Sequence, residues 1–166
     1  DEYGALNDIR NFLTFLPSNN MEESPLYASD DDPERQDPVL NQLCDTGDIE
    51  VRTVIESIAD NGQFFEIQKD YEKGMTIGFV RLSGYTAGIL ANNKKENGGL
   101  LNNRIAEKAT AFLHFCNAYN IPIVSLTDLS GFKPSYAEES VGLMKSSAGL
   151  LHAFADATVP KVNLLI

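Results

Sequence analysis

Two mostly apolar runs near the end of the chain, residues 121–129 and 159–166, flank a segment with helical spacing. The runs read IPIVSLTDL and VPKVNLLI, and continuous apolar strands are typical of a sheet covered on both faces. The segment between them predicts a helix over residues 138–157. Two strands joined by one helix predict a parallel crossover, which constrains the chain to the α/β class. The expected buried face of the helix is Val141, Met144, Ala148, Leu151 and Ala155.

The pattern from residue 51 onward supplies the rest of this α/β layout. Residues 51–58 show one apolar helical face, and Asn61-Gly62 is expected to end that helix. Residues 64–67 suggest a short strand, and the runs 75–82 and 85–91 flank Ser83-Gly84, which predicts a β-hairpin. A helix follows whose apolar side chains recur at i, i+4, i+7, i+11 and i+14. They are Ile105, Ala109, Phe112, Cys116 and Tyr119.

The chain is expected to divide into three parts. Residues 1–17 contain a short helix over 5–16, with Ile9 and Phe12 on its apolar face, and Pro17 ends it. Residues 18–50 are rich in acids and proline and indicate an acidic linker or extended arm. Residues 51–166 form the α/β domain, and because they stop on three consecutive apolar residues we interpret the chain as a piece of something larger.

Charge and motif content exclude several classes of function. The 24 acids and 13 bases give a net charge of -11, which argues against nucleic-acid binding through the phosphate backbone. No apolar run reaches the ~18 residues of a membrane span, so no span is expected, and the two unpaired cysteines indicate a cytoplasmic location. Neither a glycine-rich phosphate loop nor HExxH occurs. Cys44 and Cys116 lack CxxC spacing, so we expect two reduced thiols and no metal site.

The strongest candidate for chemistry lies where the 121–129 strand ends. The stretch TDLSGF leads from that strand toward a helix, and parallel α/β sheets bind ligands beyond the carboxyl ends of their strands. Gly131 allows the backbone to approach a ligand closely. Its N–H and that of Phe132 are candidate donors to a developing oxyanion. The alternative interpretation is that Asp128, Ser130 and Gly131 only form a turn.

Other reactive side chains give weaker signals. His114 and Cys116 are two residues apart on a helix and do not share a face, so a thiol–imidazole pair is not expected. Ser130 lacks the GxSxG context of a nucleophile elbow. His114 and His152 are far apart in sequence, and each is more typical of a solvent-facing or hydrogen-bonded histidine than of a metal ligand.

An ordered set of stretches carries a family resemblance over nearly the whole chain. They are FLPSNN (15–20), DDPER (31–35), VIESIADNGQFFEIQKDY (54–71), GFVRLSGYTAGILAN (78–92), FCNAYNIPIVSLTDLSGFKPS (115–135), E-E-x-x-G (138–142) and ADATVPKV (155–162). Through them the chain resembles the C-terminal carboxyltransferase domain of biotin-dependent acyl-CoA carboxylases and decarboxylases. Its counterparts in that family are propionyl-CoA carboxylase β subunits and the α subunits of methylmalonyl-CoA and glutaconyl-CoA decarboxylases.

The resemblance implies a fold, an activity and partners. The fold would be a crotonase-like (ClpP/crotonase) ββα superhelix, incomplete here, with residues 51–166 as the first part of the C-terminal domain. The activity would move carboxylate between biotin on a carrier protein and the α-carbon of an acyl-CoA, through backbone oxyanion holes. Its partners would be the biotin carboxyl carrier protein and neighbouring subunits of a homo-oligomer. The site would lie between domains of two subunits, so this chain alone is expected to be inactive.

The chain departs from the family pattern at three places. The usual D-V-P-G-F reads DLSGF over 128–132, the usual G-A-K reads SAG over 147–149, and the usual A-N-Q-P reads ANNK over 91–94. Two other functions therefore stay open beside the carboxyltransferase. One is a non-catalytic scaffold with the crotonase fold, and the other is a CoA-thioester hydratase or isomerase of the same superfamily.

Overall fold

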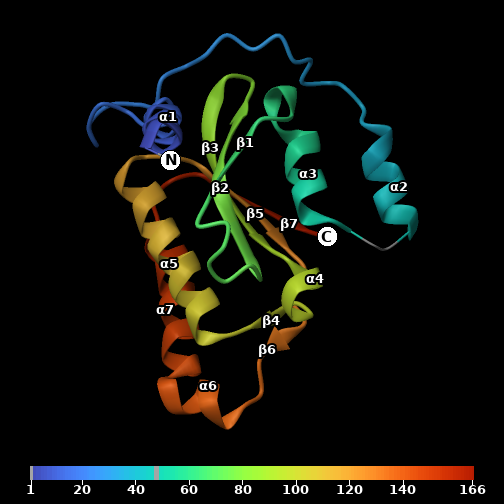
Figure 1. Cartoon of the computed structure of the whole chain (residues 1–166), viewed down its shortest axis with the longest axis vertical. Coiled ribbons are helices and arrows are strands. Elements are labelled where there is room, and N and C mark those ends of the chain that lie inside the picture. Colours follow the sequence, from blue (N-terminus) through green and yellow to red (C-terminus); the bar gives the residue numbers. More distant parts are fainter. Residues whose placement is uncertain (1, 47–48) are drawn as a thin grey trace.

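A five-stranded mixed sheet forms the centre of the molecule in the computed structural model, which describes residues 2–46 and 49–166 (Figure 1). The strand order is β1-β2-β3-β5-β7, antiparallel from β1 to β3 and parallel from β3 to β7. The strands are β1 (Phe64–Ile67), β2 (Met75–Leu82), β3 (Tyr85–Asn92), β5 (Ile123–Thr127) and β7 (Lys161–Leu165).

The predicted hairpin and the predicted crossover are both present. β2 and β3 pair from Met75↔Asn92 to Leu82↔Tyr85 around the Ser83-Gly84 turn. β5 runs parallel to β3 and to β7. One helix, α5 (Asn103–Ala118), connects β3 to β5, and two helices, α6 (Tyr136–Val141) and α7 (Leu143–Asp156), connect β5 to β7. The α/β class is therefore confirmed.

Helices cover both faces of the sheet. Successive residues of a strand point to opposite faces, so Phe79 belongs to the core under α5 and α7 whereas Val80 packs with α3 (Val51–Ile58). Figure 1 shows α5 and α7 together on one side of the sheet and α3 on the other. The predicted apolar face of α5 is confirmed, because four of its members are buried and Tyr119 packs against the same core. The four are Ile105, Ala109, Phe112 and Cys116.

The single helix predicted over residues 138–157 is wrong, because Gly142 divides it into α6 and α7. Gly142 has φ +97°, a left-handed conformation that ends α6 and lets α7 start in a new direction. The predicted buried face is wrong too: Val141, Met144 and Leu151 are 65%, 58% and 70% exposed, and Ala148 and Ala155 are exposed as well. α7 turns a different face to the core, consisting of Leu143, Ser147, Leu150 and Ala153.

β7 was predicted as a buried strand and is instead an exposed edge. All five of its residues are exposed, with Leu165 at 81%. Its strand partner in the described part of the chain is β5 on one side, and no described helix covers its apolar side chains. Its apolar composition therefore indicates a surface that is open in this structure.

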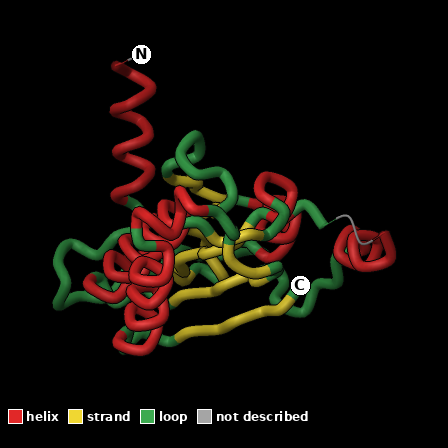
Figure 2. Tube along the Cα trace, turned by 90° about the horizontal axis from the view of Figure 1, so that it is seen from below, coloured by secondary structure: helices red, strands yellow, loops and turns green. Residues whose placement is uncertain are grey.

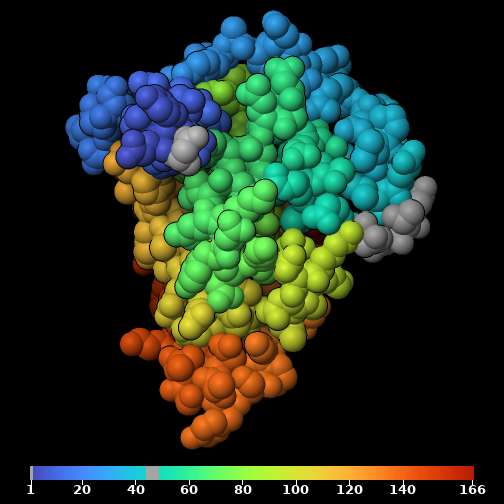
Figure 3. All heavy atoms as spheres, in the orientation of Figure 1, coloured from blue at the N-terminus to red at the C-terminus, as the bar shows by residue number. Residues whose placement is uncertain are grey.

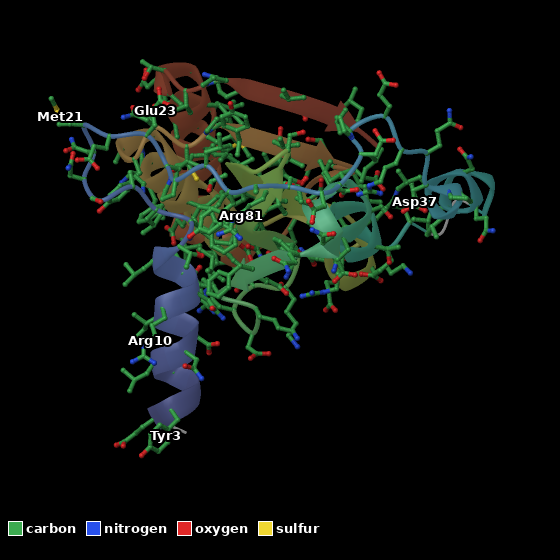
Figure 4. All side chains as sticks on the ribbon, turned by 90° about the horizontal axis from the view of Figure 1, so that it is seen from above. Tyr3, Arg10, Met21, Glu23, Asp37 and Arg81 are labelled. Atoms are coloured by element: carbon green, nitrogen blue, oxygen red, sulfur yellow. The ribbon has the colours of Figure 1, made fainter. Side chains whose placement is uncertain are left out.

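The N-terminal helix, α1 (Glu2–Leu13), begins and ends three residues before the predicted helix over 5–16. It projects from the rest of the chain and buries none of its residues (Figure 2). Figure 4 places Tyr3 at its outer tip and Arg10 midway along it. Beyond Leu13 the chain tightens into turns, where Phe15 N–H donates to Phe12 O at 3.0 Å. Phe12 and Phe15 then join the core beside Phe65 and Phe79.

The described part of the acidic segment 18–50 crosses the surface as an arm (Figure 3). It contains a helix that the sequence pattern did not predict, α2 (Pro38–Thr46). The helix was missed because its few apolar residues give little periodicity, and Leu40 and Leu43 find their partners on α3. Two arginines attach the arm to the domain. Arg35 donates to Ser57 O at 2.6 Å, and the Arg81 guanidinium lies 3.9 Å from the Tyr27 ring.

Cys116 is a buried free thiol, and the other predicted thiol, Cys44, lies outside the described side chains. Burial raises the pKa of Cys116 from 9.0 to about 12. Because only the thiolate reacts, we expect maleimide at about pH 8 to label Cys116 at least ~100-fold more slowly in the folded chain than in urea. A Cys44→Ser variant makes Cys116 the reporter, and mass spectrometry measures the rate. Equal rates in both states would show that the thiol is accessible.

Candidate functional site

Residues 128–135, which we call the site loop, lie at the carboxyl end of β5. β5 ends at Thr127, and the loop contains the two-residue strand β6 (Gly131–Phe132) before it reaches α6. In Figure 1 β6 lies at the same end of the molecule as α4 (Lys94–Asn97) and β4 (Leu100–Leu101). The prediction that this segment leads from a strand end to a helix is confirmed. The site loop therefore lies at the carboxyl-end edge of the sheet, where parallel α/β sheets bind ligands.

Gly131 and Phe132, the two predicted site residues, are both at the surface of the site loop. Gly131 has φ +138°, and a Cβ built on it meets no atom within 4 Å. Glycine is therefore required by the backbone conformation and not by close packing. Phe132 is 49% exposed. Their role as oxyanion donors stays a prediction.

The site loop is held by pairing with β4. β4 and β6 are parallel, with Leu100 opposite Gly131. Ser130 N–H donates to Gly99 O, and Lys133 N–H donates to Leu101 O, both at 2.9 Å. Gly99 has φ +72°, and a Cβ on it would lie 2.8 Å from Asp128 O. The sequence Asn97-Gly98-Gly99 predicts a loose turn, but sequence reasoning did not connect Gly99 with the site loop.

Asn92 joins the end of β3 to the start of the site loop. Its side chain is buried, it accepts from Asp128 N–H at 2.6 Å, and its Nδ2 donates to Asp128 O at 2.5 Å. Lys94 approaches the same residue from α4, with Nζ 3.0 Å from Asp128 Oδ1. Both the backbone and the carboxylate of Asp128 are therefore fixed.

The far end of the site loop is fixed by α6. Ser135 Oγ accepts from Glu138 N–H at 3.2 Å and caps the helix. The Glu138 carboxylate reaches across to the first turn of α5, where Asn103 N–H donates to Oε2 at 3.0 Å. The positive end of the α5 dipole favours an anion there. Lys133 lies 3.9 Å from the other oxygen of Glu138, so loop, α6 and α5 form one connected unit.

A cavity of about 530 Å³ opens beside the site loop. Its lining is mostly apolar, with one cation and one anion, a composition typical of sites for small organic ligands. The lining residues are Phe132, Lys133, Pro134, Glu139, Gly142, Leu143 and Met144. We call this the site cavity.

The other reactive residues give no second centre in the described part of the chain. His114 is exposed while Cys116 is buried, which confirms that they do not share a face. His152 is exposed on α7. Among residues 2–46 and 49–166, no group of three or more His, Cys, Asp or Glu side chains is arranged to hold a metal ion. None of the described helices is both long and apolar enough to cross a membrane.

Comparison with known proteins gives one consistent match. The family model described as "Carboxyl transferase domain" matches residues 1–166. The chain is 38% identical to the carboxyltransferase subunit of propionyl-CoA carboxylase from Haloferax mediterranei, over 99% of this chain and 32% of that protein. It is 39% identical to methylmalonyl-CoA decarboxylase subunit alpha from Veillonella parvula, over 99% of this chain and 33% of that protein. It thus spans about a third of the length of these relatives.

Solved structures agree with the sequence match. The chain superposes on transcarboxylase 12S with a TM-score of 0.90 at 32% identity, covering 96% of this chain and 31% of that one. Transcarboxylase 12S assembles as a hexamer, and its crystal structure holds hydrolysed methylmalonyl-coenzyme A. The beta subunit of P. aeruginosa geranyl-CoA carboxylase matches with a TM-score of 0.70 at 23% identity, which speaks for the fold alone. The crotonase-like α/β fold expected from the sequence is confirmed.

Proposed function

Because this chain belongs to the carboxyl transferase domain family, we propose that it is part of the carboxyltransferase subunit of a biotin-dependent acyl-CoA carboxylase or decarboxylase. The full-length protein would move a carboxyl group between biotin on a carrier protein and the α-carbon of an acyl-CoA. The names of its relatives support both directions, since one is a carboxylase and the other a decarboxylase.

The observation that carries this proposal is the site loop beside the site cavity. The loop presents a glycine with positive φ and a half-exposed phenylalanine at the carboxyl end of a parallel strand. Backbone N–H groups held at such a position stabilise negative charge on an oxygen without any side-chain nucleophile. This suits carboxyl transfer, in which charge develops on a carbonyl oxygen. In the proposal, Gly131 and Phe132 N–H are the donors.

The residues of the site cavity fit the bicyclic ring of biotin. Phe132 and Met144 offer apolar surface to the ring, and Lys133 and Glu139 offer one donor and one acceptor for its polar atoms. Biotin, when bound, supplies or accepts the carboxyl group. The chain's own contribution is to orient the ring and to exclude water from it. In the proposal biotin is carried by a partner protein, so the chain would hold it only transiently.

The proposal includes contacts with other chains. A biotin carboxyl carrier protein would deliver biotin, and neighbouring subunits would complete the site. α6 and α7 leave the apolar side chains of Val141, Met144 and Leu151 exposed, and Met144 also lines the site cavity, which supports a surface there that another chain covers. A cytoplasmic location stays a prediction.

The test compares the full-length protein that contains this chain with the 166-residue chain alone. We expect the full-length protein to transfer labelled carboxylate from a carboxylated biotin carrier to propionyl-CoA, or to remove it from methylmalonyl-CoA. The chain alone should show no transfer above background, because it covers only about a third of its relatives. Scintillation counting of the acyl-CoA fraction measures the gain of label in the first reaction and, with methylmalonyl-CoA labelled in its carboxyl group, the loss of label in the second.

Each of the alternatives has its own outcome. Turnover by the chain alone would contradict the proposed map of the site. A folded full-length protein that transfers no carboxylate to acetyl-, propionyl- or butyryl-CoA would favour the scaffold. Hydration of an enoyl-CoA by that protein would favour the hydratase.

A further inference from the structure

The pairing between β3 and β5 stops one residue before the site loop begins. The last backbone pair is Ala91↔Leu126, and β3 then turns away into α4. Past that point the contact between the two chain segments is made by a side chain. Asn92 bonds both backbone groups of Asp128, at 2.6 Å and 2.5 Å.

The Asn92 side-chain amide therefore takes the place of a peptide group in the ladder. An amide presents one carbonyl oxygen and one N–H₂ group, which match the N–H and C=O of a single residue on the facing strand. Asn92 as a whole is 5% exposed, so water competes little for these bonds. Aspartate at this position would keep the acceptor but lose the donor, and would set a carboxylate oxygen against Asp128 O.

We propose that Asn92 is a positioning residue of the carboxyltransferase site, which fixes the start of the site loop and thereby places Gly131 and Phe132 beside the site cavity. This inference rests on the proposed function. Gly131 lies three residues after the Asn92 contact, and the next tether is the Ser130–Gly99 backbone bond. Lys94 also reaches Asp128, but it binds the carboxylate and its side chain is exposed. Asn92 is the buried side chain that holds the Asp128 backbone, so a substitution can remove this tether without altering the main chain.

The alternative is that Asn92 only stabilises the sheet, and Asn117 provides a matched control. Asn117 also tethers a distant backbone, since its Oδ1 accepts from Thr158 N–H at 2.8 Å. This contact lies at the opposite end of the sheet from the site loop. Asn117 is at the end of α5, just before β5 begins, and Thr158 comes just before β7 begins. Both tethers join a side chain to a distant backbone, but only Asn92 touches the site loop, so effects on that loop are expected in Asn92 variants alone.

The experiment uses Asn92→Ala and Asn117→Ala in the full-length protein. Hydrogen exchange measured by mass spectrometry should show peptides over 128–133 exchanging at least about tenfold faster in Asn92→Ala and unchanged in Asn117→Ala. In carboxyl transfer to the acyl-CoA, Asn92→Ala should lower kcat about tenfold and leave KM nearly unchanged. A misplacement of about 1 Å costs roughly a hundredfold in rate, and we expect a smaller shift of the loop here. Asn117→Ala should keep its kcat per folded molecule.

Two results would overturn the proposal: unchanged exchange over 128–133, or faster exchange with unchanged kcat. Should Asn92→Ala fail to fold, Asn92→Asp preserves the side-chain volume and is judged by the same two measurements. If the unaltered protein transfers no carboxylate, the proposed function fails on its own. In that case the positioning role is overturned together with the function. The hydrogen-exchange data still show whether Asn92 holds the site loop.

Discussion

Replacing Gly131 by valine in the full-length protein is expected to slow carboxyl transfer about a hundredfold, the cost of losing one oxyanion donor, or roughly 3 kcal/mol of barrier. The cause is the backbone, because φ +138° at Gly131 is a conformation that valine cannot readily adopt. The valine side chain itself meets open space, since no atom lies within 4 Å of a Cβ at this position. The backbone must therefore rotate, and its N–H moves with it.

The fold should survive this substitution, because Gly131 lies in a two-residue strand at the surface. Gly62→Val is the matched control: Gly62 is also exposed, has φ +67° and lies near β1, away from the site loop. Turnover per folded molecule and thermal unfolding are measured on both variants. The turn interpretation of Gly131 predicts the opposite pattern, a lower melting temperature with turnover per folded molecule unchanged, and that result would remove Gly131 from the site.

The elements that sequence could predict are those whose partners are close in the chain or whose pattern is long. The hairpin of β2 and β3 closes on its own turn, and α5 carries five apolar residues in strict helical register. β5 could be assigned because its apolar run is continuous and ends in polar residues. Such local patterns were enough to give the α/β class and to place Gly131 at a strand end.

The errors arise where apolar residues have no partner in this structure. Val141, Met144 and Leu151 were assigned to a buried face because apolar spacing was taken to mean burial, yet they are exposed. The prediction that β7 is buried is wrong for the same reason, because its apolar residues lie on an open edge of the sheet. The spacing of apolar residues in a sequence indicates that a face is buried from water, but it does not indicate whether the same chain or another chain buries it.

The supports of the candidate site were missed for a different reason. Asn92 and Asp128 are 36 residues apart, and Asn103 and Glu138 are 35 apart. Asparagine and glutamate at element ends are usually local caps, so nothing in the sequence connects these pairs. They become visible only when the crossover brings the end of β3, the site loop and the start of α5 together.

Replacing Lys108 by methionine is expected to lower the free energy of unfolding by about 3 kcal/mol or more, because it removes a buried charged donor from several backbone carbonyl oxygens. Lys108 is 5% exposed on α5. Its Nζ donates to Tyr71 O at 2.6 Å, to Met75 O at 2.7 Å and to Gln68 O at 3.2 Å. One ammonium thus closes the loop between β1 and β2, and methionine of similar length fills the space but leaves these carbonyl oxygens without their donor.

Lys161 offers the same chemistry at the surface. Its Nζ donates to Phe154 O at 2.8 Å and to Ala157 O at 2.5 Å, but the residue is exposed, so water can replace the lost donor. Lys161→Met should therefore cost well under ~1 kcal/mol, as most surface substitutions do. Urea unfolding of the 166-residue chain measures both variants. Equal losses of unfolding free energy in the two variants would show that burial does not determine how much Lys108 contributes to stability.

The pH dependence separates burial from hydrogen bonding at Lys108. Burial lowers the pKa of Lys108 from 10.5 to about 8, with the charge of Glu72 acting in the opposite direction. Between these two pH values the unfolded chain binds more protons at this residue than the folded chain does, so the contribution of Lys108 to stability rises with pH. Cys116 acts in the opposite sense above its ordinary pKa of 9.0, because its pKa in the folded chain is raised to about 12.

The difference between the unaltered chain and Lys108→Met cancels the Cys116 contribution, since both proteins carry that thiol. This difference in unfolding free energy should grow as the pH is raised from about 8 toward 10.5. A difference that stays level up to about pH 10.5 and shrinks above it would mean that the carbonyl oxygens of the 68–75 loop hold the ammonium more strongly than burial disfavours it. The pKa of Lys108 would then be raised, and its charge, rather than its packing, would be what closes the loop.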